Sequence, residues 1–248
     1  MQWNDSCILL SASKYGERAG VIGLFSRAHG IHRSISKNAY TSKQRGLYQP
    51  GNIAEVEWKA RLAEHMGSIT ADLQRPIAPL LLDDPLALDA LGSICSLLQR
   101  FIHEREPHPA LYDRTEALLT HMAAGHVWQP YYVKWELALL AELGYGLDLS
   151  ECAATGQTHE LVYVSPKSGR AVCREAGAPY AEKMLALPAF LISDAAAEEV
   201  DEACLYHGLT LTGYFLQQWV ATPHHMQLPD ARYRLAERLE KRQEKQSA

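Results

Sequence analysis

Residues 27–45 contain five cationic side chains and no carboxylate. The Lys and Arg residues of this segment are Arg27, Arg33, Lys37, Lys43 and Arg45. Such a cluster is typical of a polyanion-binding site, where protein cations neutralise phosphates and release bound counterions. The alternative is a solvated pair of strands whose cations protect an exposed sheet edge. Composition alone does not separate these two interpretations.

Aromatic residues lie close to this segment in the sequence. They are Tyr15, Phe25, Tyr40 and Tyr48. Aromatic faces on a basic sheet can stack the unpaired bases of a nucleic acid without reading their sequence. Because Phe25 belongs to an apolar run, we expect its ring in the core instead.

Two cysteines indicate the remnant of a metal site. Cys152 and Cys173 each stand where a Cys-x-x-Cys pair would begin, but Thr155 and Ala176 occupy the second positions. A structural zinc ion needs four protein ligands in a tetrahedron, and two thiols do not supply them. We therefore expect neither a metal ion nor another cofactor, and interpret the segment as a ribbon-like hairpin held by packing.

The eleven histidines raise the possibility of catalysis. Two pairs are spaced five residues apart, His103 with His108 and His121 with His126, so neither pair shares a helical face. Neither His159 nor Cys204 has a spacing characteristic of a zinc ligand. No His-Glu-x-x-His, Gly-x-Ser-x-Gly or phosphate-loop pattern occurs. We therefore predict no catalytic residues and no enzyme.

The charge is distributed unevenly along the 248 residues. Residues 1–80 hold ten Lys/Arg against six Asp/Glu, and residues 81–248 hold fourteen against twenty-three. A basic front and an acidic back indicate two modules with different partners. No apolar run approaches the roughly 18 residues of a membrane span, and the N-terminus lacks an export signal. Five cysteines without close pairing are typical of reduced thiols, so we expect a cytoplasmic protein without membrane contact.

The pattern of residues 1–80 predicts a small β-structure. Alternating or apolar runs predict strands at residues 7–10, 21–26, 31–37, 53–58 and 66–73. The intervening turns carry Gly, Pro and Asn. Short strands at this spacing favour a sheet that closes on itself, such as an OB-type barrel in residues 1–80.

From residue 81 onward the apolar period becomes helical. We predict helices beginning at Pro85, Pro109 and Pro130, the last ending at Gly144. Strand and turn signals occupy residues 147–180, and helical character returns at about 180–187, 195–220 and 228–245. The fold class is therefore α+β, with a barrel in residues 1–80 followed by a mainly helical domain in residues 81–248 that carries a small β insertion.

Several motifs together resemble the bacterial recombination mediator family RecO. In the front module they are Tyr15–Glu17, Leu24–Ser26, His29–Gly30 and Leu47–Asn52. In the back module they are Trp135–Leu140, Leu143–Tyr145, Leu149–Cys152, Tyr163–Pro166 and Pro188–Leu191. The order and spacing of these motifs, rather than any single one, make the resemblance specific.

The resemblance implies an N-terminal OB fold, a helical domain and a zinc-ribbon-like insertion that binds metal in only some members. It implies binding to single- and double-stranded DNA and annealing of complementary strands. It also implies action with RecR in loading RecA onto DNA coated by the single-stranded DNA-binding protein SSB, without covalent chemistry. By the same resemblance, Arg27, Arg33, Lys37, Lys43 and Arg45 correspond to the family's basic DNA-binding surface.

The expected protein contact is the SSB tail, which is acidic and ends in an apolar residue. The groove that receives this tail should offer cations beside apolar pockets, and Lys134 with its helix is a candidate. Two other functions stay open at this point. One is a zinc-dependent nucleic-acid enzyme, and the other is a protein-interaction adaptor whose basic patch meets an acidic partner.

Overall fold

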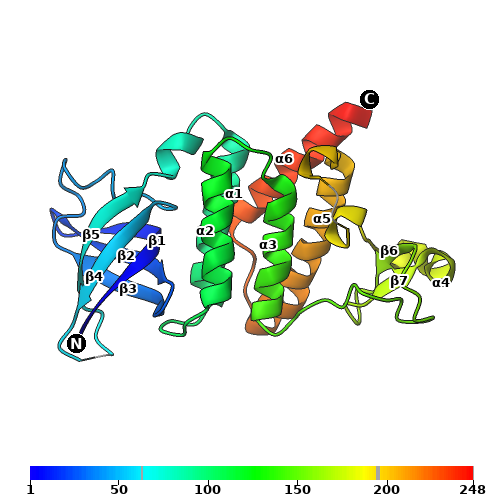
Figure 1. Cartoon of the computed structure of the whole chain (residues 1–248), viewed down its shortest axis with the longest axis horizontal. Coiled ribbons are helices and arrows are strands. Elements are labelled where there is room, and N and C mark those ends of the chain that lie inside the picture. The colour runs from blue at the N-terminus through cyan, green and yellow to red at the C-terminus, as the bar shows by residue number, and fades with distance from the viewer. Residues whose placement is uncertain (63, 194–195, 248) are drawn as a thin grey trace. The chain divides into compact units, whose positions relative to one another are not determined.

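The computed structural model describes residues 1–62, 64–193 and 196–247 (Figure 1). The chain forms two compact units, which we call the barrel unit (Met1–His126) and the helical unit (Val127–Ala248). No helix in the described part of the chain is both long and apolar enough to cross a lipid bilayer.

Five strands close into a barrel in the order β1-β2-β3-β5-β4. They are β1 (Gln2–Tyr15), β2 (Ala19–Ser26), β3 (Gly30–Ser36), β4 (Ile53–Lys59) and β5 (Ser68–Arg75). All neighbours pair antiparallel except β3 and β5, which pair parallel at Ile35 and Ser68. A five-stranded barrel with this order is an OB-like fold, which confirms the fold class expected from the sequence.

The central residues of β1 form a continuous apolar run because both faces of the strand are buried there. Cys7 and Leu9 belong to the core cluster inside the barrel, together with side chains of β2 and β4. Ile8 and Leu10 are also buried, and helix α1 (Pro85–Phe101) packs on β1. Gln99 of α1 donates to the carbonyl oxygen of Leu10 at 3.2 Å. The strand therefore reads as apolar throughout its centre because neither face meets water.

The helices of the barrel unit begin where the sequence predicts. The Asp84 carboxylate accepts hydrogen bonds from the backbone of Leu86 and Ala87, which caps α1. A short 3-10 turn, η1 (Ala78–Leu81), precedes α1, and α2 (Pro109–Ala123) follows it. The connection between α1 and α2 lies so close to the barrel that a Cβ on Gly30 would stand 2.0 Å from the carbonyl oxygen of Glu106.

Three long helices build the helical unit. They are α3 (Gln129–Glu142), α5 (Glu202–Phe215) and α6 (Asp230–Ser247). The segment η5 (Leu216–Ala221) continues α5 as a π-helical turn, and the 3-10 turn η6 (Thr222–His224) follows it. Buried Glu136 of α3 and buried Arg232 of α6 form an ion pair with a 2.6 Å contact. Thr212 of α5 donates to the same carboxylate, so one polar cluster joins all three helices.

A small sheet with the strand order β7-β6-β8 completes the helical unit. Its strands are β6 (Leu161–Val164), β7 (Ala171–Cys173) and β8 (Leu185–Ala186), with α4 (Arg174–Gly177) and η2 (Ala178–Lys183) between β7 and β8. The 3-10 turns η3 (Ala189–Leu191) and η4 (Ala197–Glu199) follow. The expected helix at 180–187 is therefore wrong beyond residue 183. Pro188 disfavours helix in the residue before it, and β8 pairs with β6 instead.

The expected domain boundary at residue 80 stays a prediction. The barrel strands end before it, at Arg75. Helices α1 and α2 follow it and belong to the same compact unit as the barrel. The insertion expected at 147–180 contains β6 and β7, whereas β8 lies just beyond its end.

Candidate nucleic-acid interface

The basic segment forms the turn between β2 and β3, strand β3 and the first part of the connection from β3 to β4. Arg33 lies on β3, Lys37 directly follows the strand, and Lys43 and Arg45 lie in the turns of the connection. The side chains of all four residues are solvent-exposed. Arg33, Lys37, Lys43 and Arg45 form no ion pair with any residue that the structure describes, and we call these four side chains the cation strip. Their charge is available to an external polyanion.

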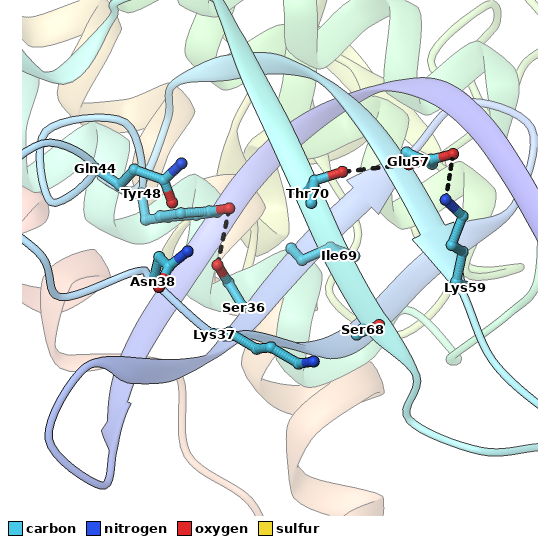
Figure 2. Close-up of a pocket in the computed structure, with 10 residues that line it drawn as sticks. All are labelled: Ser36, Lys37, Asn38, Gln44, Tyr48, Glu57, Lys59, Ser68, Ile69 and Thr70. Atoms are coloured by element: carbon cyan, nitrogen blue, oxygen red, sulfur yellow. Dashed lines mark hydrogen bonds and ion pairs between the residues drawn. The ribbon is translucent and has the colours of Figure 1, made fainter.

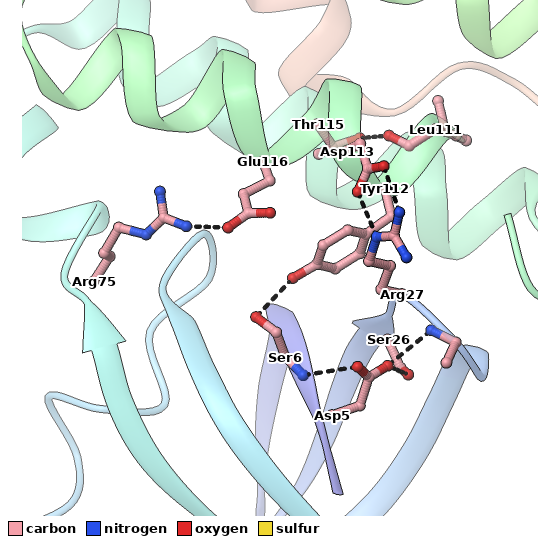
Figure 3. A network of polar contacts seen from close by, with 11 residues as sticks. Asp5, Ser6, Ser26, Arg27, Arg75, Leu111, Tyr112, Asp113, Thr115 and Glu116 are labelled. Atoms are coloured by element: carbon pink, nitrogen blue, oxygen red, sulfur yellow. Dashed lines mark hydrogen bonds and ion pairs between the residues drawn. The ribbon is translucent and has the colours of Figure 1, made fainter. Parts of the chain in front are cut away.

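Arg27, the fifth predicted cation, has a different environment (Figure 3). Its guanidinium donates from two nitrogen atoms to the two carboxylate oxygens of Asp113 on α2, at 2.7 and 2.8 Å. This hydrogen bonding raises the pKa of Arg27 and lowers the pKa of Asp113. Arg27 is therefore the least available of the five cations to a phosphate group.

A carboxylate fixes the turn that carries Arg27. Asp5 of β1 accepts hydrogen bonds from the backbone of Ser6 at 2.9 Å and of Ala28 at 2.8 Å, and from the Ser26 hydroxyl. Tyr112 of α2 donates to the Ser6 hydroxyl at 3.1 Å (Figure 3). These contacts hold the end of β2, the start of β1 and α2 together. These contacts therefore fix the position of the turn between β2 and β3.

A polar pocket of about 210 Å³ lies beside the cation strip (Figure 2). Lys37 and Lys59 line it, together with Asn38, Gln44 and the hydroxyl-bearing side chains of β3 and β5. The Lys59 ammonium lies 2.8 Å from the carboxylate of Glu57, which offsets its charge. Tyr48 accepts a hydrogen bond from Ser36 at 3.0 Å and forms one wall. The pocket therefore offers several donors to a phosphate or sugar group, together with Lys37, which forms no ion pair with a described residue.

The aromatic residues expected near the interface divide by burial. Phe25 is fully buried, as expected, and Tyr48 is only 3% exposed. Tyr40 is half-buried and donates its hydroxyl to the carbonyl oxygen of Ala12. Tyr15 is 59% exposed at the end of β1. Of these four, Tyr15 therefore has the most accessible ring for stacking, whereas Phe25 and Tyr48 serve the core.

The cysteine pair lies inside the small sheet of the helical unit. Cys152 and Cys173 are buried, and the backbone N–H of Cys173 donates to the Sγ atom of Cys152 at 3.2 Å. The Thr155 hydroxyl lies 3.8 Å from Cys173 Sγ. Burial raises the pKa of Cys152, but hydrogen bonds from Thr155 and from backbone amides outweigh it and lower this pKa to about 6.

This cluster does not fit a zinc ion. It brings together two thiols and a hydroxyl, and the fourth position, Ala176, carries only a methyl group. Within the described residues, no group of three or more His, Cys, Asp or Glu side chains is arranged to hold a metal ion. Two thiols fall short of the four ligands of a structural zinc site.

The structure also places the two histidine pairs and Lys134. His121 and His126 have ring centroids 4.8 Å apart, and His103 lies 3.8 Å from the carboxylate of Glu106. Lys134 is half-buried on α3. Its partner-binding role stays a prediction.

The comparison with known proteins gives a consistent result over most of the chain. Residues 1–76 match the family model described as "Recombination protein O N terminal", and residues 82–228 match "Recombination protein O C terminal". A "DNA repair protein RecO" from Rhodospirillum centenum is 44% identical over 97% of this chain and 96% of its own length. The chain belongs to the RecO family.

Other relatives agree with this membership. Proteins of the same name from Rhodospirillum rubrum and Granulibacter bethesdensis are 44% and 42% identical, each over 96% of both chains. The resemblance drawn from the sequence motifs is thus confirmed, and the chain is a member of a family of DNA repair proteins. The RecO family model for the N-terminal part covers the whole barrel, including the cation strip.

Local sequence patterns do not indicate two features of this barrel. One is Asp113, whose pairing with Arg27 depends on a contact 86 residues away in the chain. The other is a group of rings around Trp3 and Trp58, which are register partners on β1 and β4. Trp58 falls within the alternation of residues 53–58, which signals its inward direction, but no local pattern marks Trp3.

Proposed function

We propose that this RecO family member is a DNA-binding recombination mediator that acts in DNA repair. In this proposal it binds single- and double-stranded DNA through the barrel unit and anneals complementary strands. Together with RecR it helps to load RecA onto single-stranded DNA coated by SSB, whose acidic tail it contacts. It performs no covalent chemistry and works in the cytoplasm, at the nucleoid. The names of the relatives support the DNA repair role.

The cation strip carries the DNA-binding part of this proposal. Four exposed cations, which form no ion pair among the described residues, lie on β3 and the β3–β4 connection of an OB-like barrel. Phosphate contacts of this kind fix a strand without reading its sequence. Neutralising the phosphates of two strands also lowers the repulsion that opposes their pairing. The same surface therefore suits both binding and annealing.

A salt titration of DNA binding tests the proposal. We expect Arg33→Gln combined with Lys37→Gln to weaken binding to all DNA sequences about equally. The slope of log K against log salt should fall by about 2 on duplex DNA, because each lost phosphate contact removes about 0.9. Fluorescence anisotropy at several salt concentrations measures both quantities.

A control variant with the same loss of charge makes the result specific. Lys241→Gln combined with Lys245→Gln removes two exposed cations of α6 in the helical unit. We expect this variant to bind DNA as the wild type does. If both variants lose the same affinity and slope, the binding reflects charge alone and the cation strip is not the site. Failure of the wild type to bind a bare oligonucleotide would favour an adaptor for an acidic protein.

A further inference from the structure

The barrel unit contains a second, more open pocket, of about 480 Å³, which differs from the polar pocket in its chemistry. Its lining includes Trp3 of β1, Trp58 of β4, and His29 from the turn between β2 and β3. Arg105, from the connection between α1 and α2, forms part of the rim. We call it the ring pocket.

Stacked rings form its wall. The rings of Trp3 and His29 lie parallel within 19°, with centroids 4.3 Å apart. On β4, the ring of Trp58 lies parallel to Trp3 within 13°, at 5.6 Å. His32 meets Trp3 edge-on at 5.2 Å. Because Trp58 and His32 are buried while Trp3 and His29 are half-buried, the accessible surface of this stack comes from Trp3 and His29.

The rim of the ring pocket is basic. None of the described residues that line it is acidic, and it includes the exposed guanidinium of Arg105. Arg105 donates to the backbone carbonyl oxygens of Glu64 and His65, at 2.8 and 3.2 Å. Its own backbone N–H donates to the carbonyl oxygen of Ile31 at 2.9 Å. The cation is therefore held in place beside the rings.

We propose that the ring pocket receives an unpaired base of single-stranded DNA, with the neighbouring phosphate at Arg105. This inference rests on the DNA-binding function proposed above and adds a place where single strands are distinguished from duplex. Aromatic rings stack on any base because every base has a π-face. A base within a duplex is already stacked and paired, so it does not enter the pocket.

Stacking is also compatible with annealing. It uses the face of the base and leaves the edge that forms base pairs free. The cation strip holds phosphates of either strand type, whereas the ring pocket holds only a base that is out of the helix. The two sites therefore make separable contributions to binding.

Two substitutions test the proposal, with an oligothymidylate and a duplex of equal length as probes. His29→Ala removes the half-buried ring that lines the pocket but keeps the backbone bonds of residue 29 to Ser26 and His32. We expect it to weaken oligothymidylate binding about five-fold or more, with duplex binding changed less than about two-fold. Tyr180→Ala, which removes an exposed ring of η2 in the helical unit, should leave both affinities unchanged.

Rescue separates stacking from a loss of structure. His29→Phe restores an aromatic face and should restore oligothymidylate binding to near the wild-type value. An equal loss on both probes, or a loss with Tyr180→Ala but not with His29→Ala, would overturn the assignment. So would a His29→Ala variant that binds oligothymidylate normally but no longer binds an acidic peptide with an apolar C-terminal residue. If the wild type bound neither DNA probe, the proposed function itself would fail.

Discussion

Arg27 is held by Asp113 through two hydrogen bonds, although its sequence position groups it with the cations of the DNA-binding segment. About half of each side chain is exposed, so the pair contributes little to stability. Its main effect concerns binding, because a phosphate must compete with Asp113 for the same guanidinium. Within the segment, the cation strip and Arg27 therefore differ in availability.

We predict that Asp113→Asn raises the affinity for DNA. Release of Arg27 adds one phosphate contact, which increases the duplex binding constant about two- to eight-fold at 0.1 M salt and steepens the salt slope by about 0.9. Anisotropy titrations measure both values. Loss of a negative charge alone would also help binding, so Arg27→Gln and the double variant complete the cycle. A gain of equal size in the Arg27→Gln background would show that Arg27 is not the group released.

The buried pair of Glu136 and Arg232 should matter for stability. The guanidinium donates to both carboxylate oxygens, at 2.6 and 3.0 Å, and also to the carbonyl oxygen of Leu209 at 2.6 Å. We predict that Glu136→Ala lowers the free energy of unfolding by about 3–5 kcal/mol, because it leaves a buried unpaired charge. Urea denaturation measures this loss. Glu237→Ala removes an exposed carboxylate of α6 and should change stability by less than about 0.5 kcal/mol. Similar losses in both variants would contradict the account.

The pH dependence of stability should reflect His32. Burial comes first among the causes that lower the pKa of His32 to about 4, followed by the charges of Arg105 and His29, although the hydrogen bond to the His29 carbonyl opposes them. A histidine with a lowered pKa binds fewer protons in the folded state. The free energy of unfolding therefore falls as the pH falls from about 6.5 towards 4.

The expected contribution of His32 at pH 5 is a loss of about 2 kcal/mol relative to pH 7.5. Urea denaturation at the two pH values should show a smaller difference in His32→Gln than in the wild type. The exposed His159 provides a matched control, since His159→Gln should keep the wild-type difference. An unchanged difference in His32→Gln would exclude His32 as the source.

Restoring two thiols beside the small sheet tests whether the cysteine pair is the remnant of a zinc site. Thr155 lies beside the two cysteines, and Ala176 follows Cys173 by one helical turn in α4. Thr155→Cys combined with Ala176→Cys supplies two further thiols, and we predict that this double variant binds one zinc ion with four thiolate ligands. Metal analysis after dialysis measures the content. The same variant with Cys152→Ser should lose most of the zinc, and retention would show that the ion sits elsewhere.

Local patterns were sufficient for most of the elements. Alternation in residues 31–37 and 53–58 predicts β3 and β4, and Pro85 with Asp84 predicts the start of α1. Those signals depend only on neighbours in the chain. Strand β8 has just two residues and forms because β6 provides a free edge, so no local pattern marks it.

The candidate site was predictable only in part. The cation strip follows directly from composition, because exposed cations are the ordinary state of Lys and Arg. The capture of Arg27 by Asp113 and the stack of Trp3 with His29 depend on contacts across the fold. Burial of Tyr48 likewise follows from closure of the barrel and not from its sequence neighbours.

Strand annealing on SSB-coated DNA tests the central claim most directly. Two complementary fluorescent oligonucleotides, each coated with SSB, are mixed with this protein across a salt series, with and without RecR. We predict faster annealing that fades as salt rises, and a smaller effect for Arg33→Gln with Lys37→Gln. Bound DNA without any acceleration, either alone or with RecR, would contradict the assignment of this RecO family member as a mediator.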